Sequence, residues 1–275
     1  MKDLVKVVGR HKFVLIATTA VVCALSAAPA LATPSGGYAV FADCPLSNPA
    51  VADCIVATTS SGEFTVGAKN VPIKHAITLQ GGLAVNEETG AVTFVGAADG
   101  NTLSKTPQTV PGGLLGIEGL GGEVTATAEL AGSASAIALN LENALSGTGT
   151  ALSLPTKLKL GNPFLGNHCY GGSNSHPITL NLTTGTTSPP KPNKPITGNP
   201  GTLEIEEEEI IVINGNSLVD NSFAAPGVEG CGLIPFFVDP LVDLAMGVPA
   251  SAGHNTAILN GTIKLTTAEE VKKHS

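Results

Sequence analysis

The stretch LKLGNPFLGNHCYGGSNSHPITLNLTTGTT, Leu158–Thr187, organises the fold of this chain. An alternating apolar and polar segment stands on each side of a compact loop that is rich in Gly, Ser and Asn. Alternation with a period of two is typical of half-buried β-strands. Cys169 lies in the loop, and Cys231, in the sequence EGCG, is its expected disulfide partner. That bond would tie the stretch to the last third of the chain.

Four cysteines follow residue 32: Cys44, Cys54, Cys169 and Cys231. An even number of cysteines in an exported chain predicts disulfides. Of the three possible connectivities we favour Cys44 with Cys54 and Cys169 with Cys231, because DCPLSNPAVADC reads as a loop closed on itself. The chain-entropy model gives about 2.8 kcal/mol for the short loop and about 4.3 kcal/mol for the long one. A zinc site is the alternative, but no C-x-x-C spacing supports it.

Residues 1–32 have the pattern of a signal peptide. A basic segment that ends at Lys12 precedes the apolar run Phe13–Ala27, and Ala30-Leu31-Ala32 is an A-x-A cleavage site. The alternative is an uncleaved membrane anchor, which the cleavage pattern disfavours. No later stretch reaches the roughly 18 apolar residues that a membrane span needs. We therefore expect a secreted protein, extracellular or associated with the cell surface, with no transmembrane segment after signal cleavage.

The chain that remains after cleavage is strongly acidic. Residues 1–32 hold four of the 14 Lys and Arg and one of the 22 Asp and Glu, so the remaining 243 residues carry a net charge of −11. Arg10 is the only arginine of the sequence. Such a chain lacks the basic surface that neutralises phosphates, so we expect no nucleic-acid partner. The same acidity disfavours binding to anionic membrane surfaces.

After the signal peptide the sequence reads as short strands, rich in Val, Ile and Thr, that Gly, Pro and Asn interrupt. The segments Glu123–Leu130 and Ile178–Leu182 alternate most cleanly. Ser60-Ser61-Gly62 and Gly81-Gly82 predict turns between strands. These patterns predict a mainly β fold, either a β-sandwich or an irregular β-barrel, with one or two short helices and two disulfides. We expect residues 33–275 to form a single secreted all-β domain.

Two segments in the second half interrupt this pattern. Residues 183–201 contain five prolines, and we interpret them as an exposed loop within the domain; the alternative is a linker or a proline-rich ligand. The segment Leu203–Ile213 predicts strands with a turn inside Glu206–Glu209. We favour solvent-exposed glutamates there over a calcium site, because the segment lacks a D-x-D-x-D-G loop.

One helix stands out near the end of the chain. Asp239 suits the N-cap, Pro240 suits the first helical position, and Gly247 ends the pattern. We expect four apolar side chains to pack this helix on the sheet: Phe236, Phe237, Leu241 and Leu244.

The sequence contains no G-x-S-x-G elbow, no H-E-x-x-H and no phosphate-binding loop. We expect no cofactor and no resident metal. The candidate site consists of three histidines that the second disulfide would draw together, His168, His176 and His254, as metal ligands or as acid–base groups. A hydrolytic triad of Asp220, His254 and a serine is the alternative. Surface or structural histidines are the favoured interpretation of both sets.

The segments Asn221–Gly232 and Asn167–His176 consist mainly of small and polar residues. If the disulfide brings them together, they frame a shallow pocket of amide and hydroxyl groups. Such a pocket suits a carbohydrate or a peptide. Sugar-binding sites usually stack the sugar on aromatic rings, and Tyr170 is the one aromatic polar residue nearby.

The segments NPFLGNHCYGGSNSHPITLNLTTGTT and NSLVDNSFAAPGVEGCG resemble those of uncharacterised secreted proteins of actinobacteria. The resemblance covers most of the chain after residue 32, including all four cysteines. It implies export and a shared fold. It brings no activity, cofactor or site residue that transfers to this chain.

These observations predict an exported, non-enzymatic binding or structural protein of the cell envelope or the extracellular space. Its expected partner is a cell-wall or extracellular polymer or a protein. A secreted hydrolase that uses the histidines near Cys169 is the alternative hypothesis. A β-barrel pore of the envelope comes last, because seven Phe and two Tyr after residue 32 give poor aromatic girdles.

Overall fold

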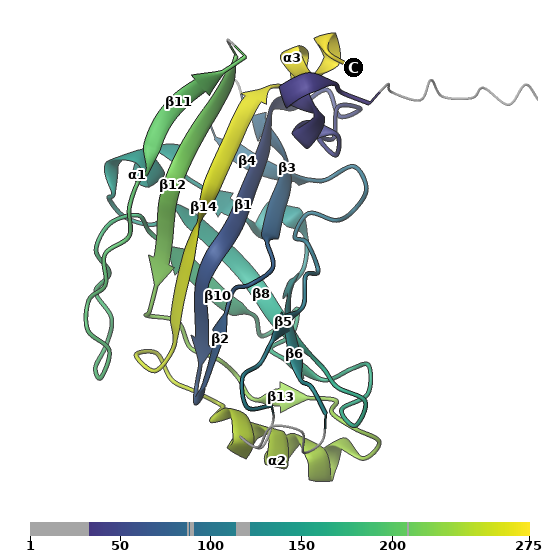
Figure 1. Cartoon of the computed structure of the whole chain (residues 1–275), viewed down its shortest axis with the longest axis vertical. Coiled ribbons are helices and arrows are strands. Elements are labelled where there is room, and N and C mark those ends of the chain that lie inside the picture. Colours follow the sequence, from purple (N-terminus) through teal and green to yellow (C-terminus); the bar gives the residue numbers. More distant parts are fainter. Residues whose placement is uncertain (1–32, 87, 89–90, 114–121, 208) are drawn as a thin grey trace, which may run out of the picture. The chain divides into compact units, whose positions relative to one another are not determined.

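Two antiparallel β-sheets face each other in the computed structural model (Figure 1). The structure describes residues 33–86, 88, 91–113, 122–207 and 209–275, and these belong to one compact unit, Thr33–Ser275. The predicted signal peptide lies outside the described residues. The predicted mainly β fold is confirmed as two sheets rather than a closed barrel.

Sheet A has the strand order β11-β12-β14-β1-β3-β4, and β2 also pairs with β1. All of its pairs are antiparallel. Its strands are β1 (Val51–Val66), β2 (Lys69–Pro72), β3 (Ile77–Val85), β4 (Val92–Gly96), β11 (Thr202–Glu206), β12 (Ile210–Asp220) and β14 (Thr256–Thr267). The long strands β1 and β14 lie side by side at its centre (Figure 1).

Sheet B has the strand order β13-β9-β8-β6-β5, and β7 and β10 also pair with β8. Its strands are β5 (Gln108–Thr109), β6 (Thr125–Leu130), β7 (Ala138–Leu139), β8 (Leu152–Gly161), β9 (Tyr170–Gly171), β10 (Ile178–Leu182) and β13 (Val228–Glu229). The sequence places Pro155 inside β8. Pro155 lies between the part of β8 that pairs with β7 and the part that pairs with β6, where the ladder is already interrupted. A proline is tolerated there because no regular ladder bond is lost.

Short helices cover the ends of the sheets. The α-helices are α1 (Leu141–Ser146), α2 (Pro235–Met246) and α3 (Ala268–Lys273), and the 3₁₀-helices are η1 (Gly36–Phe41) and η2 (Ala134–Ala136). Helix α2 begins at Pro235, five residues before the predicted first helical position Pro240. Asp239 and Pro240 therefore lie inside the helix, and the prediction of Asp239 as its N-cap is wrong. It ends at Gly247 as predicted, in the left-handed conformation that favours glycine.

Both predicted disulfides are present. Cys44 bonds to Cys54 and Cys169 bonds to Cys231, with Cα–Cα distances of 5.5 Å and 4.1 Å. The second bond joins the loop after β8 to the segment before α2. Next to it, β9 pairs with β13 through Tyr170 and Glu229. The loop of the central stretch is thus fixed to the last third of the chain.

Two glycine-containing segments predicted as turns lie within continuous strands instead. Gly62 is inside β1, at φ +127°, and a Cβ there would collide with the Ile258 carbonyl of β14. Gly81 is inside β3, and a Cβ there would collide with the Val95 carbonyl and the Phe94 ring. These glycines serve the close approach of neighbouring strands rather than a change of chain direction.

Two loops in the second half of the chain border the edge of sheet A. The turn expected within Glu206–Glu209 separates β11 from β12, so it is confirmed. The Glu206 carboxylate pairs with Lys264 at 2.7 Å, and Glu207 accepts a hydrogen bond from the Gly37 N–H at 2.9 Å. Residues 183–201 run beside β12, to which Asn199 is bridged through Ser217.

Two main apolar cores stabilise the unit, beside a minor cluster of Val71, Val110 and Val124. The large core fills the space between the sheets. The small core lies on the other face of sheet A, where η1, the Cys44–Cys54 loop and α3 cover it. It contains Tyr38, Phe41 and Val271, each of which is at most 1% exposed. The inner face of sheet A is therefore the face left for the space between the sheets.

Candidate functional site

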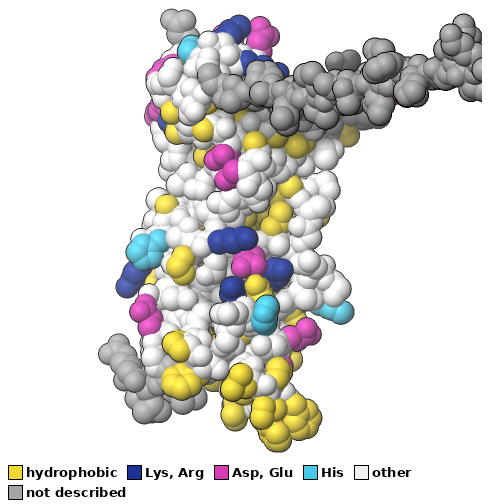
Figure 2. Space-filling model, turned by 90° about the vertical axis from the view of Figure 1, so that its right-hand side faces the viewer, with side chains coloured by type: hydrophobic (Ala, Val, Ile, Leu, Met, Phe, Trp, Pro, Cys, Tyr) yellow, Lys and Arg dark blue, Asp and Glu magenta, His cyan; other side chains and the backbone are white. Residues whose placement is uncertain are grey.

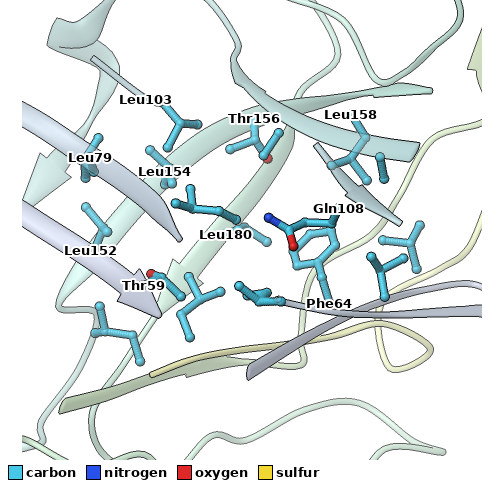
Figure 3. A pocket seen from close by; sticks show the side chains of 18 of the residues that line it. Thr59, Phe64, Leu79, Leu103, Gln108, Leu152, Leu154, Thr156, Leu158 and Leu180 are labelled. Carbon is cyan, nitrogen blue, oxygen red and sulfur yellow. The ribbon is translucent and has the colours of Figure 1, made fainter. Parts of the chain in front are cut away.

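A cavity lies within the large core, between the facing sides of the two sheets (Figure 3). Its volume is about 110 Å³. Leucines of both sheets point into it, among them Leu79 of β3, Leu154 of β8 and Leu180 of β10. The cavity is thus a product of the sandwich itself and not of a surface loop.

Strand β8 supplies one wall through its alternation. Every second residue lines the cavity: Leu152, Leu154, Thr156, Leu158 and Leu160. Side chains of a strand alternate between its two faces, so this spacing places all five on one side. The alternation predicted for this part of the sequence therefore decides the composition of the wall.

Strand β1 supplies the opposite wall, although its lining residues do not keep one spacing. Ala57 and Thr59 line the cavity before a register shift between Thr59 and Ser61, and Phe64 and Val66 line it after the shift. An extra residue in one strand of a ladder exchanges the faces to which the following side chains point. The bulge therefore lets both halves of β1 face the same cavity.

Small side chains leave the space open. Ala126 and Ala128 of β6 line the cavity next to the leucines of β8. A protein interior is normally filled to the density of an organic crystal, with few voids larger than a water molecule. A large side chain at either alanine would occupy space that the structure leaves empty.

The polar side chains of the lining are mostly held by the protein backbone. The Gln108 carbonyl accepts hydrogen bonds from the N–H groups of Lys74 and His75, and its amide donates to the His75 carbonyl. The Lys69 ammonium donates to the Gly113 carbonyl at 2.8 Å. These groups therefore present mainly their carbon atoms to the cavity.

Two threonines complete the polar part of the lining. The Thr156 hydroxyl donates to the Ile178 carbonyl at 3.0 Å. Thr59 is the lining residue whose hydroxyl makes no hydrogen bond within the described part of the chain. Figure 3 shows it at the margin of the leucine cluster. Among the described residues of the lining, the Thr59 hydroxyl is therefore a polar group that is open to a ligand.

The size and chemistry of the cavity define what it accepts. A volume of 110 Å³ is comparable to the engineered apolar cavity of ~150 Å³ that stays dry and takes up benzene. A polar group placed against this lining would lose its water without gaining hydrogen bonds, at a cost of roughly 1–3 kcal/mol or more. The cavity therefore fits a slender apolar group better than a sugar or a peptide.

Helix α2 closes the cavity at one end. Its Met246 lines the cavity, and Val242 belongs to the same core. Val242 is fully buried. Because Met has a flexible unbranched side chain, it adapts easily to the shape of a bound group. The sequence pattern predicted the helix but gave no sign that it borders a cavity.

The predicted histidine site is not assembled as one cluster. His168 borders a shallow polar hollow, His176 contacts Ser175 through Nδ1 at 3.2 Å, and His254 lies in the loop before β14. Within the described residues, no group of three His, Cys, Asp or Glu side chains is arranged to hold a metal ion. The acid–base role of these histidines stays a prediction.

The predicted triad requires Asp220 to orient His254, but Asp220 has other hydrogen-bond partners. Asp220 is 2% exposed, and its carboxylate accepts hydrogen bonds from the backbone N–H groups of Asn181 at 2.7 Å and Ser222 at 2.8 Å. Burial raises the pKa of Asp220 above 3.8, although these two hydrogen bonds act in the opposite direction. Because Asn181 belongs to β10, the carboxylate connects the two sheets instead of orienting a histidine.

The shallow polar hollow predicted at the central loop is formed by the two expected segments. Ser173, Asn174 and Ser175 border it from one segment, and Glu229 and Gly230 from the other. The bond between Cys169 and Cys231 holds the segments together.

Tyr170 lines the same hollow, and the Lys157 ammonium lies 5.1 Å from the centre of its ring. Proximity to Glu129 and partial burial raise the pKa of Tyr170, with burial the larger cause. The hollow thus offers an aromatic face, amides and hydroxyls to a polar ligand.

No family model, curated protein or solved structure matches this chain. Across the residues that the structure describes, no helix has both the length and the apolar character needed to cross a membrane.

Proposed function

We propose that this protein is an exported, non-enzymatic binding protein that holds a slender apolar molecule between its two sheets. The observation that carries this proposal is the cavity lined by leucines of both sheets. Its ligand class is a hydrocarbon chain, such as the tail of a fatty alcohol or a lipid. A polar end of that ligand would meet Thr59, whose hydroxyl has no partner among the described residues.

The chemistry of the lining supports binding rather than catalysis. The amide of Gln108 and the ammonium of Lys69 are both engaged with backbone groups. Catalysis needs a nucleophile or an acid–base group at hydrogen-bond distance from the reacting atom. Apolar contact supplies affinity in proportion to the buried area, about 25 cal/mol for each Å². A leucine-lined cavity therefore suits retention of an unreacted hydrocarbon.

The test is a titration of the protein Thr33–Ser275, labelled in its methyl groups, with 1-octanol. We expect saturable NMR shifts at the methyl groups of Leu154, Leu158 and Leu180, which line the cavity. Leu203, on the edge strand β11 and 51% exposed, is the internal reference and should not shift. The absence of saturable shifts at the cavity leucines would refute the proposal.

A matched pair of variants separates the cavity from the surface. Ala128→Leu fills the cavity, whereas Thr127→Leu adds a similar side chain to the opposite face of the same strand. We expect Ala128→Leu to weaken octanol binding at least tenfold and Thr127→Leu to leave it unchanged. Equal affinities for both variants would show that octanol binds elsewhere.

The polar hollow beside Tyr170 supports a second candidate, binding of a cell-wall or extracellular polymer. Its aromatic ring, hydroxyls and amides are the groups that recognise a carbohydrate. The test is co-sedimentation of Thr33–Ser275 with isolated cell envelope. Saturable binding that Tyr170→Ala abolishes would support this function and a location at the cell surface. Undiminished binding of the variant would exclude the hollow as the polymer site.

A further inference from the structure

Helix α2 presents a continuous apolar surface to the solvent. Six side chains at its start and along its outer side are between 58% and 101% exposed: Leu233, Ile234, Phe236, Phe237, Leu241 and Leu244. We call this set the α2 face. Figure 2 shows the same kind of side chains gathered at the end of the molecule where α2 lies in Figure 1. The four predicted to pack α2 on the sheet, Phe236, Phe237, Leu241 and Leu244, thus point away from it.

Helical spacing explains why these side chains share one side. At about 100° per residue, Phe236, Phe237, Leu241 and Leu244 fall within an arc of roughly 140°. The remaining exposed position of that arc is Pro240, which is also apolar. The outer arc of α2 therefore carries no polar side chain.

The two acidic residues of α2 are turned toward the protein. The Asp239 carboxylate accepts hydrogen bonds from the N–H groups of Gly230 at 3.2 Å and Cys231 at 2.8 Å. The Asp243 carboxylate accepts one from the Val228 N–H at 2.7 Å. Both carboxylates therefore accept hydrogen bonds from the segment that contains Cys231 of the second disulfide. As a result, the α2 face has no charge of its own.

The inner side of α2 is apolar as well. Val242 and Met246 are buried in the large core, and Val238 packs against it. A helix with apolar side chains on both its inner and its outer side is normally covered on both. The exposed side is therefore suited to a second apolar environment beyond the protein.

The absence of polar side chains on the α2 face favours a lipid layer over a second protein surface as its partner. Interfaces between proteins combine an apolar centre with a polar rim and typically about ten hydrogen bonds. The side chains of the α2 face offer no donor and no acceptor, and Leu233 stands free at 101% exposure. Hydrocarbon needs no hydrogen bonds, and Phe and Leu are the residues with which interfacial helices enter a lipid layer.

The charge of the protein selects the kind of lipid. The formal net charge of the sequence is −8, and an acidic protein is repelled by anionic headgroups. The uncharged α2 face is complementary to a lipid surface without net charge. Because Met246 lines the cavity from the inner side of the same helix, the lipid would lie about one helix diameter, ~10 Å, from the cavity.

We propose that the α2 face docks this protein onto the surface of an uncharged lipid layer. The docking site and the cavity share one helix, so a bound hydrocarbon has a short path between them. Docking itself does not depend on the cavity. The cavity-filling variant Ala128→Leu should therefore still bind lipid surfaces.

The test is flotation of Thr33–Ser275 with vesicles of phosphatidylcholine. The variant Phe236→Gln/Leu244→Gln changes two side chains that are 80% and 82% exposed, so it removes little packing, and Gln is a good helix former. The matched control is Leu203→Gln/Ile205→Gln on β11, whose side chains are 51% and 65% exposed. We expect the wild type and the control to float, and the α2 variant to bind at least tenfold more weakly.

Three results would overturn the proposal. The first is a wild-type protein that does not float at millimolar lipid. The second is an equal loss of flotation in the α2 variant and the β11 control. The third is a dimer in analytical ultracentrifugation that the α2 substitutions dissociate without changing flotation, which would assign the face to a second copy of the chain. If Ala128→Leu loses octanol binding but still floats with vesicles, docking and hydrocarbon binding are independent, so that either proposal can fail without the other.

Discussion

The Asp239 carboxylate accepts a hydrogen bond of 2.8 Å from the backbone N–H of Cys231. This contact joins the middle of α2 to the residue that forms the long disulfide. It also turns the charge of Asp239 away from the solvent-exposed arc of the helix. One side chain thus fixes the position of α2 and leaves its outer face uncharged.

Substitution of Asp239 should therefore destabilise the fold. Asp239→Ala leaves the N–H groups of Gly230 and Cys231 without their acceptor, and we expect the free energy of unfolding to fall by about 1–3 kcal/mol. Urea denaturation with the disulfides intact measures this loss. Asp239→Asn keeps one acceptor oxygen and should lose less. A variant as stable as the wild type would show that solvent replaces the carboxylate without cost.

Substitution of glycines by alanine should show at which positions a neighbouring strand leaves no room for a Cβ atom. Gly62→Ala meets the Ile258 carbonyl of the neighbouring strand at a positive φ, so we expect a loss of more than about 3 kcal/mol or failure to fold. Gly100 also has a positive φ, +78°, but a Cβ there meets no atom within 4 Å. Gly100→Ala should therefore cost about 1–2 kcal/mol. Thermal unfolding of both variants compares the two costs, and similar melting temperatures would contradict the close approach of β1 and β14.

The buried Asp220 should make stability depend on pH. Its pKa is raised above 3.8 in the folded state, chiefly by burial. Between about pH 4 and the raised pKa, the folded protein holds a proton that the unfolded chain has released, so the contribution of Asp220 to stability falls as pH rises. Asp220→Asn removes this titration.

The measurement is the free energy of unfolding of the wild type and of Asp220→Asn at several pH values. The stability of the variant relative to the wild type should increase as pH rises through that window. A constant offset comes from the lost hydrogen bond to Asn181 or Ser222 and does not affect the slope. Parallel pH profiles of the two proteins would contradict the raised pKa.

The two disulfides should contribute unequally. The Cys169–Cys231 bond spans 62 residues and the Cys44–Cys54 bond spans 10. The chain-entropy model then assigns about 4 kcal/mol to the long loop and about 3 kcal/mol to the short one. We expect Cys169→Ser/Cys231→Ser to lower the free energy of unfolding more than Cys44→Ser/Cys54→Ser. The reverse order in denaturant titrations would show that local packing outweighs loop closure.

Much of the architecture is predictable from local sequence patterns. The alternation of Ile178–Leu182 matches β10, the pairing of the four cysteines is confirmed, and the turn within Glu206–Glu209 joins β11 to β12. The turns predicted at Gly62 and Gly81 are wrong, because both residues lie inside strands. Glycine is used both in turns and where two strands approach closely, and only the neighbouring strand distinguishes these uses.

The cavity could be anticipated only in part. The alternating leucines of β8 predict an apolar face, but they do not show that the facing wall leaves room. That room depends on Ala126 and Ala128, and on the bulge after Thr59 that turns both halves of β1 inward. A register shift arises from the pairing of β1 with β14, so one strand alone does not reveal it.

The sequence by itself determined the β class and the existence of a helix that ends at Gly247, because each depends on residues close together or on a short repeating pattern. It also favoured the disulfide pairing, because the segment from Cys44 to Cys54 closes on itself and leaves Cys169 and Cys231 to each other. Tertiary structure alone decided which side of that helix faces the core. Apolar residues occur around most of α2, so periodicity does not choose between its sides. The hydrogen bonds of Asp239 and Asp243 to the segment before the helix make the choice. They turn Val242 and Met246 inward and leave Phe236 and Leu244 in the solvent, since a partly buried carboxylate without hydrogen-bond donors costs more free energy than an exposed leucine.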